Sequence, residues 1–204
     1  KPVKYAHVAP IMKEENGGKR KLSKRKDPEA AVTFYAEQGY PQDSVNEYVM
    51  TIANSNFEDW RRANKDASLD KFPFNPKKMS VSGALFDIAK LTDVSKNVIS
   101  MMTAEDVFSQ SYEWAKEYNQ QLAALYEQDK AYATAVLNID RGNKKPRKDI
   151  AKWSDIPDYI SYMYDETFAP CYELCGNATP GLAADVLESY IDTVNLADDK
   201  DTWF

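Results

Sequence analysis

The sequence predicts a mainly α-helical fold with one short β segment near its N-terminus. Beyond residue 27, apolar residues recur at the three- and four-residue spacing of helix faces. Only 7 of the 204 residues are glycine, which argues against a turn-rich all-β design. Apolar residues make up 43 % of the chain and aromatic residues 12 %, enough to build the cores of one or two domains.

The β segment is expected at residues 4–12, an apolar run that ends before a turn-forming stretch. His7 lies within this run, and we predict that it is a packed strand residue. Gly17 and Gly18 are expected to act as a hinge for a basic loop at residues 19–26.

The first helix is predicted to begin at Asp27 and to end at Gly39. Asp suits the N-cap, Pro28 suits the first helical position, and Glu29 places an acid in the first turn. Glycine readily takes the left-handed conformation that ends a helix. A second helix is expected after Pro41.

The rest of the chain is predicted to be a series of helices. Residues 72–76 contain two prolines and interrupt the helical pattern, and residues 92–102 resume it. Residues 103–106 match a capping box that opens a long helix. Further helices are expected at residues 122–139, at residues 156–168, after Thr179-Pro180, and as a first turn at residues 198–204.

The net charge of −6 hides a strong asymmetry along the chain. Residues 1–26 hold nine Lys or Arg, and residues 141–152 hold six. Residues 155–204 hold eleven acids and a single lysine. Local basic patches on an acidic protein indicate a partner that touches selected phosphates, whereas a general polyanion binder would be basic throughout. Solvated surface charge is the alternative interpretation for any single lysine.

Several classes of protein are excluded by composition. No apolar run approaches the roughly 18 residues of a membrane span. The first residues have no Met start and no apolar core of a signal peptide, and we expect the chain to start inside a longer protein. Cys171 and Cys175, with a single histidine in the chain, are too few ligands for a metal site. They are expected to be ordinary thiols of a reducing cytosol.

One short motif has a specific chemistry, Lys21-Leu22-Ser23-Lys24-Arg25. Two lysines three residues apart on a mobile loop can close on the negative charge that develops when pyrophosphate leaves ATP. Alone the motif is weak, because a solvated Lys/Arg run looks the same. It resembles the KMSKS signature of class I aminoacyl-tRNA synthetases, in the form found in the glutamyl branch.

The flanking segments carry the same resemblance in the same order. Residues 6–11 resemble the strand before the signature loop of the glutamyl family, residues 37–41 the turn between the next two helices, and residues 80–91 a later Ser-x-x-Ala-x-Phe-Asp-x-x-Lys-Leu segment. Residues 53–56 depart from the family, which often has Gly-Trp there, and this indicates an outlying subfamily. The His-x-Gly-His signature of the class is absent, since His7 is the only histidine.

The resemblance implies a segment of a bacterial-type glutamyl-tRNA synthetase in three parts. Residues 1–26 would be a remnant of the catalytic domain, residues 27–102 a helical stem-contact domain, and residues 103–204 the first part of a helical anticodon-binding region. In the whole enzyme Lys21 and Lys24 would be catalytic, and the ATP-binding residues would be Lys21, Ser23, Lys24 and Arg25.

The resemblance also implies the cofactors and partners. The whole enzyme would use ATP and Mg²⁺, whereas the segment alone is expected to hold no cofactor and to catalyse nothing. Its partner would be a glutamate-accepting tRNA, with no DNA and no membrane, and the protein is expected to be a cytoplasmic monomer.

A second basic segment is the predicted tRNA contact. Single-stranded anticodon bases are usually read by aromatic stacking and by arginine hydrogen bonds. Trp153, Tyr159 and Tyr162 follow the basic segment, and Arg147 is the loose match to an arginine of the family that contacts the anticodon. A solvated loop ahead of an aromatic core helix is the alternative. The cations predicted to contact tRNA are Arg141, Lys144, Lys145, Arg147 and Lys148.

Two other identities fit parts of the pattern. A glutaminyl-tRNA synthetase shares the signature loop but in its usual form reads the anticodon with β-barrels, which the helical periodicity after Thr103 disfavours. A free-standing helical RNA-binding or interaction protein with a chance basic loop is the alternative from another class.

Overall fold

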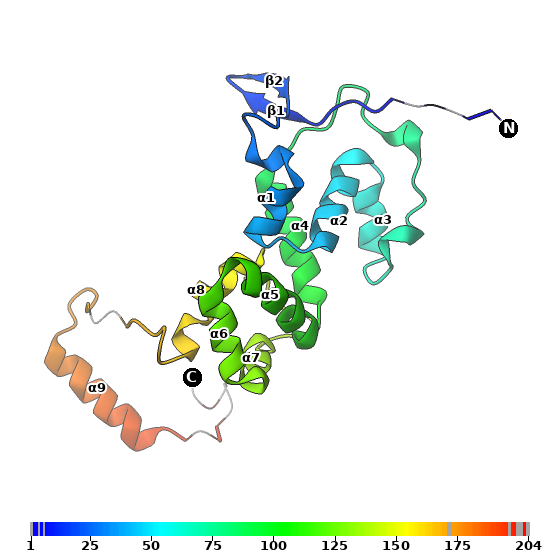
Figure 1. The fold of residues 1–204 in the computed structure, drawn as a ribbon. Coiled ribbons are helices and arrows are strands. Elements are labelled where there is room, and N and C mark those ends of the chain that lie inside the picture. The colour runs from blue at the N-terminus through cyan, green and yellow to red at the C-terminus, as the bar shows by residue number, and fades with distance from the viewer. Residues whose placement is uncertain are drawn as a thin grey trace. The chain divides into compact units, whose positions relative to one another are not determined.

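The computed structural model describes residues 2–3, 5, 7–170, 173–195, 197–198 and 202. The chain divides into two compact units, residues 1–167 and residues 168–204. Helices dominate the first unit, whose described strands form one small hairpin, and the second unit contains helix α9 between irregular segments (Figure 1). The prediction of a mainly α fold is therefore confirmed. Within the described residues, no helix is long and apolar enough to cross a membrane.

The strands lie later in the chain than the predicted β segment, and they form a hairpin that was not predicted from the sequence. Strand β1 (Met12–Glu15) pairs antiparallel with β2 (Gly18–Lys21). Asn16 and Gly17 have φ of 51° and 76°, the pair of positive φ angles that a two-residue hairpin turn of type I′ requires. The predicted strand was therefore wrong over residues 7–11, and residues 19–21 are strand instead of loop. The expected glycine hinge is this hairpin turn.

His7 is exposed, so the prediction of a packed strand residue was wrong. In the described part of the chain, backbone pairing on this segment starts only at Ile11, whose carbonyl accepts a hydrogen bond of 2.9 Å from Leu22 N. Among the residues that the structure describes, no strand pairs with the residues just before Ile11 to bury them.

Helix α1 (Val32–Gln38) is shorter than the predicted first helix. A single 3₁₀ turn follows Asp27, and then Ala31 is extended, with φ −104° and ψ 138°. Gly39 ends α1 in the left-handed conformation, as predicted. Helix α2 (Gln42–Ala53) follows Pro41, also as predicted.

Helix α3 (Phe57–Ala63) and two 3₁₀ turns lead to helix α4 (Ile88–Met101). Helix α4 begins four residues before the predicted residue 92. The reason is the N-cap Asp87, whose Oδ1 accepts hydrogen bonds from the backbone of Ala89 and Lys90.

Helix α5 (Ala104–Tyr118) begins where the capping box predicted, and Thr103 Oγ1 accepts a hydrogen bond of 3.1 Å from Asp106 N. The predicted helix at residues 122–139 is two helices, α6 (Gln120–Gln128) and α7 (Lys130–Leu137). Asp129 separates them, since its extended backbone ends one helix and its side chain caps the next.

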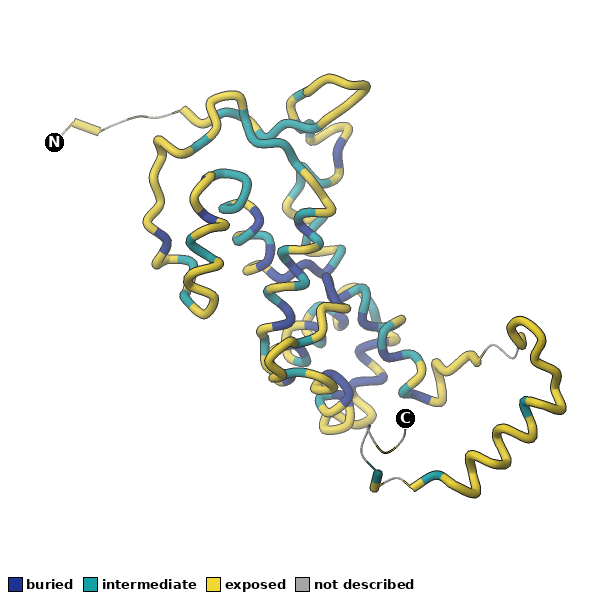
Figure 2. Tube along the Cα trace, turned by 180° about the vertical axis from the view of Figure 1, so that it is seen from behind, coloured by how far each residue is buried: buried dark blue, intermediate teal, exposed yellow. Residues whose placement is uncertain are grey.

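Helix α8 (Ile156–Ile160) and the 3₁₀ turn after it end at Met163, short of the predicted residue 168. Helices α4 to α8 surround the larger of two cores in the first unit, where buried residues gather (Figure 2). A smaller core contains Tyr40, Tyr48 and Leu91. Helix α4 contributes Leu91 to the smaller core and Ile99 to the larger one.

The second unit contains helix α9 (Pro180–Thr193). Its predicted cap is confirmed, because Thr179 Oγ1 accepts a hydrogen bond of 3.2 Å from Leu182 N. The helical turn predicted at residues 198–204 lies largely outside the described residues, which there are Asp198 and Thr202. Cys171 also lies outside them, and Cys175 is an exposed free thiol.

Candidate functional site

The basic loop after β2 is closed into a tight turn. Asp27 N donates to the Ser23 carbonyl over 2.8 Å, and Lys26 N donates to the same oxygen over 3.1 Å. In return, Ser23 N donates to Asp27 Oδ2 over 2.8 Å. The two ends of the turn are thus joined, and the side chains of Lys24, Arg25 and Lys26 are left exposed between them.

The Asp27 carboxylate at the base of this turn is only 2 % exposed. Arg20 donates to both of its oxygens, Nη1 to Oδ2 over 2.6 Å and Nη2 to Oδ1 over 2.8 Å. Lys13 Nζ lies 3.3 Å from Oδ1. The Arg20 hydrogen bonds hold the pKa of Asp27 well below its ordinary value, although burial acts in the opposite direction.

The residues predicted to bind ATP phosphates lie on and beside this turn. Lys21 is the exposed last residue of β2, Ser23 is half-buried, and Lys24 and Arg25 are exposed. Within the described residues, no carboxylate forms an ion pair with Lys21, Lys24 or Arg25. Three cations without acid partners can meet a polyanion without first breaking a salt bridge.

Two of the sequence landmarks lie side by side at the hairpin. Met12 N donates to the Ala84 carbonyl over 2.8 Å, and Phe86 N donates to the Met12 carbonyl over 2.7 Å. Gly83, with φ of 85°, leaves no room for a side chain, since a Cβ there would lie 2.3 Å from the Pro10 carbonyl oxygen. The segment at residues 80–91 therefore supports the strand that leads into the turn.

The landmark at residues 37–41 joins the two cores. Trp153 N donates to the Gly39 carbonyl over 2.8 Å, and Trp114 Nε1 donates to the Ala36 carbonyl over 3.0 Å. A Cβ on Gly39 would lie 2.8 Å from Trp153 Cβ. Trp153 is only 4 % exposed, so its ring is core and is not available for stacking on a base, contrary to prediction.

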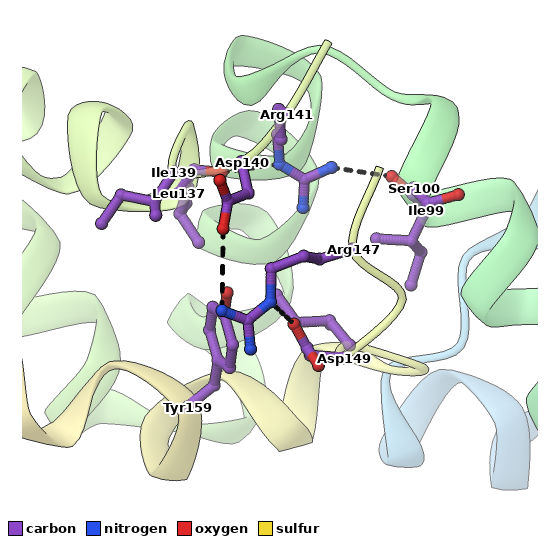
Figure 3. Close-up of a pocket in the computed structure, with 10 residues that line it drawn as sticks. Ile99, Ser100, Leu137, Ile139, Asp140, Arg141, Arg147, Asp149 and Tyr159 are labelled. Atoms are coloured by element: carbon purple, nitrogen blue, oxygen red, sulfur yellow. Dashed lines mark hydrogen bonds and ion pairs between the residues drawn. The ribbon is translucent and has the colours of Figure 1, made fainter. Parts of the chain in front are cut away.

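Arg141, the first cation of the second basic segment, is directed into the protein. Its Nε donates to the Leu137 carbonyl over 2.6 Å, and its Nη1 donates to the Ile99 carbonyl over 2.8 Å (Figure 3). Burial lowers the pKa of Arg141 from its ordinary value. These contacts tie the start of the loop to α4 and α7, and the predicted tRNA contact of this residue stays a prediction.

Arg147 is exposed but engaged with acids. Its Nε donates to Asp149 Oδ2 over 2.6 Å, and its Nη1 lies 3.7 Å from Asp140 Oδ2. Figure 3 shows the guanidinium between these carboxylates and beside Tyr159. The hydrogen bond to Asp149 raises the pKa of Arg147. The side chain thus lies between two carboxylates and next to an aromatic ring.

The other cations of the same loop are lysines. Lys144, Lys145 and Lys148 are exposed, and no ion pair engages them within the described residues. Tyr162 is 58 % exposed. The structure thus brings Arg147 and Tyr159 together, and leaves three lysines on the loop around them.

Sequence reasoning missed Arg20 and Asp27 as parts of the first site. Asp27 was interpreted as a helix cap, yet its side chain makes no capping hydrogen bond. The sequence signal was one acid, Asp27, at the end of a basic run. The run starts at Lys19 and is interrupted only by Leu22 and Ser23.

Comparison with known proteins identifies the chain. No family model matches it. It is 44 % identical over 200 residues to a glutamate–tRNA ligase of Acetivibrio thermocellus, and the match covers 98 % of this chain and 37 % of that protein. The chain corresponds to a segment of a bacterial-type glutamate–tRNA ligase. The resemblance drawn from the sequence landmarks is confirmed.

Other glutamate–tRNA ligases show the same extent of similarity. A protein of Clostridium perfringens strain 13 is 47 % identical over 205 residues, covering 98 % of this chain and 38 % of its own length. One of Sorangium cellulosum is 42 % identical over 220 residues, covering all of this chain and 38 % of its own length. The chain thus spans less than two fifths of the glutamate–tRNA ligases it matches, and the glutaminyl alternative is not favoured.

Proposed function

We propose that the whole protein joins glutamate to tRNA in two steps. The glutamate carboxylate attacks the α-phosphate of ATP and pyrophosphate leaves; the terminal ribose hydroxyl of tRNA then attacks the activated carbonyl and AMP leaves. The observation that supports this most is the 44 % identity to a glutamate–tRNA ligase across 98 % of the chain. We propose ATP with Mg²⁺ as the cofactors, and a cytoplasmic monomer as the working form.

The turn after β2 supplies cations to the departing pyrophosphate. Lys21 and Lys24 are exposed and without ion pairs among the described residues, so their ammonium groups can close on charge as it develops. Ser23 and Arg25 complete the phosphate-binding set with a hydroxyl and a planar guanidinium. The effect of these residues is electrostatic, and they exchange no proton with the substrate.

The second basic loop contacts tRNA. Lys144, Lys145 and Lys148 bind phosphates as point charges, and Arg147 beside Tyr159 presents a planar group to an unstacked base. The proposed division of the chain is a catalytic-domain remnant at residues 1–26, a stem-contact domain at 27–102 and an anticodon-binding part at 103–204. Helix α4 contributes to both cores, so the last two parts share packing.

The test compares the full-length protein with residues 1–204 alone. ATP–pyrophosphate exchange is measured with glutamate, Mg²⁺ and tRNA present, followed by charging of tRNA with labelled glutamate. The full-length protein should be active in both assays. The segment alone should show no exchange, because it lacks a His-x-Gly-His signature. A full-length protein that activates glutamine and not glutamate contradicts the proposal, and so does exchange by the segment alone.

A further inference from the structure

We propose that Asp27 is a positioning residue for the phosphate-binding turn, and that it acts by holding Ser23 and Arg20 so that Lys24 meets the leaving pyrophosphate. This inference rests on the proposed function of the turn. It concerns a residue that follows the signature motif and touches no substrate.

The contacts of Asp27 are directed at the turn and the hairpin. The Asp27 side chain makes no capping hydrogen bond to the following 3₁₀ turn. Its oxygens instead accept from Ser23 N and from two guanidinium nitrogens of Arg20. A carboxylate that is 2 % exposed and bound by these donors is a fixed point, since removing one partner leaves a buried charge unpaired.

The strand register explains why a buried acid is needed at this place. Lys13 and Arg20 are Cα partners across the hairpin, and both side chains reach Asp27. Like charges directly opposite each other on two strands repel. Asp27 is the shared counter-ion of this pair, with Glu29 as a second acid bound to Lys13. Without the carboxylate at position 27, the hairpin loses the group that keeps Arg20 on the face toward the turn.

The hairpin and the turn divide the basic residues into a set that binds Asp27 and a set that is exposed. Successive residues of a strand point to opposite faces, so the Arg20 side chain faces Asp27 while Lys21 faces away and is exposed. At the other end of the turn, Lys24 and Arg25 remain without ion pairs among the described residues. Asp27 therefore neutralises the base of the turn and leaves the charge of its exposed part for a polyphosphate.

The first test is the exchange reaction of the full-length protein carrying Asp27→Asn, which keeps the size of the side chain and removes its charge. We expect kcat to fall roughly 10- to 100-fold, because small misplacements of a catalytic group carry losses of this order, while KM for glutamate stays unchanged. The matched control is Glu15→Gln, which removes the other carboxylate of Arg20, 47 % exposed and not bonded to the turn. Its kcat should stay within about twofold of wild type.

The second test separates positioning from a merely structural role. In a Lys24→Ala background, Asp27→Asn should lower kcat by a clearly smaller factor than in the wild-type background, because one of the groups that Asp27 positions is already gone. An equal fold-loss in both backgrounds overturns the inference and makes Asp27 a residue of general stability. If Asp27→Asn does not fold, as judged by circular dichroism, Arg20→Gln enters the same cycle and must give the same non-additive result.

A third measurement does not depend on catalysis. We expect trypsin to cleave after Lys24 or Arg25 faster when the turn opens, because proteolysis follows local opening, and the products are identified by mass spectrometry. Asp27→Asn should accelerate this cleavage, and Glu15→Gln should not. Equal cleavage rates in the two variants overturn the inference even in an active enzyme. If the wild-type protein shows no glutamate-dependent exchange, the proposed function is contradicted. The cleavage rates then still report whether Asp27 holds the turn closed.

Discussion

The two basic loops of the first unit have similar compositions but make different use of their charges. In the turn at residues 23–27 the acid is buried, at 2 % exposure, and it holds the ends of the loop, while the cations between them form no ion pair with any residue that the structure describes. In the loop at residues 141–148 the arginines are the engaged residues, Arg141 by carbonyls and Arg147 by two surface acids. The position of the carboxylate thus decides which cations are available, and composition alone does not give that position.

This difference suits two kinds of recognition. Free ammonium groups on a closed turn act as point charges and can follow a phosphate group as its charge grows. Arg147, which donates to Asp149, presents a planar guanidinium beside Tyr159, and this arrangement suits an unstacked base. The first loop is therefore expected to act on rate, and the second on the choice of tRNA.

The largest expected effect concerns Lys24 in the first loop, whose side chain is proposed to act on the rate of activation. In the full-length protein, Lys24→Ala should slow glutamate-dependent exchange roughly 10²–10³-fold with little change in KM for glutamate, as for the loss of one transition-state charge contact. Lys65→Ala, an exposed lysine outside both loops, is the control for loss of one charge. A change confined to KM for glutamate would contradict the role of Lys24.

A smaller effect is expected at Arg147. Arg147→Ala should weaken binding of the cognate tRNA by roughly 1–3 kcal/mol and weaken binding of an anticodon-swapped tRNA by less, if the arginine reads a base. Filter binding with the full-length protein measures both. Equal losses would make Arg147 a phosphate contact, and the contrast between the loops would then disappear. No loss on either tRNA would leave only a solvated loop.

The lysines of the second loop should affect tRNA binding through salt alone. Replacing Lys144 and Lys145 by Gln should lower the slope of log affinity against log salt by about one to two units, equally for all tRNAs, since each phosphate contact releases counter-ions. The control is the replacement of Lys116 and Lys130 by Gln. These two lysines lie over the Tyr112 ring, and their loss removes the same charge outside this loop. An unchanged slope for Lys144 and Lys145 would place them away from the RNA.

The smallest expected effect is an absence of change with pH at the first loop. The pKa of Asp27 lies below the ordinary 3.8 because Arg20 binds its charged form. The stability it contributes is therefore fully present above 3.8 and is lost only as pH falls through the lowered value. The amide-proton shift of Ser23, followed by NMR, should stay constant from neutral pH to about pH 4. A midpoint above 3.8 would mean that the buried acid is not held by Arg20.

The sequence predicted local features well and pairing between distant residues less well. Gly39, Thr103 and Thr179 were correctly placed at helix ends, because caps depend on residues within one turn. Asp129 was missed as a helix boundary, since apolar periodicity continues through it. The strand was expected too early, at residues 4–12, and the hairpin was not predicted, because residues 14–15 were interpreted as part of a turn and residues 19–21 as part of a basic loop.

The same distinction applies to the candidate sites. The exposed Lys21, Lys24 and Arg25 followed from a contiguous motif. The inward direction of Arg141 depends on the Ile99 carbonyl, and the burial of Trp153 depends on Gly39, contacts across 42 and 114 residues that no local pattern contains. Sequence therefore located the charges, and the folded chain decided which of them face outward.

The contact at Gly39 constrains the design of chimaeric enzymes. A chimaera that exchanges everything after residue 103 would place a foreign residue 153 against the native Gly39, where the hydrogen bond of 2.8 Å and the absence of room for a Cβ admit little variation. The donor of the helical half must therefore also supply residues 36–41, although these lie more than sixty positions before the cut. A chimaera designed from the linear sequence alone would take residues 36–41 from one enzyme and residue 153 from another, although these residues contact each other.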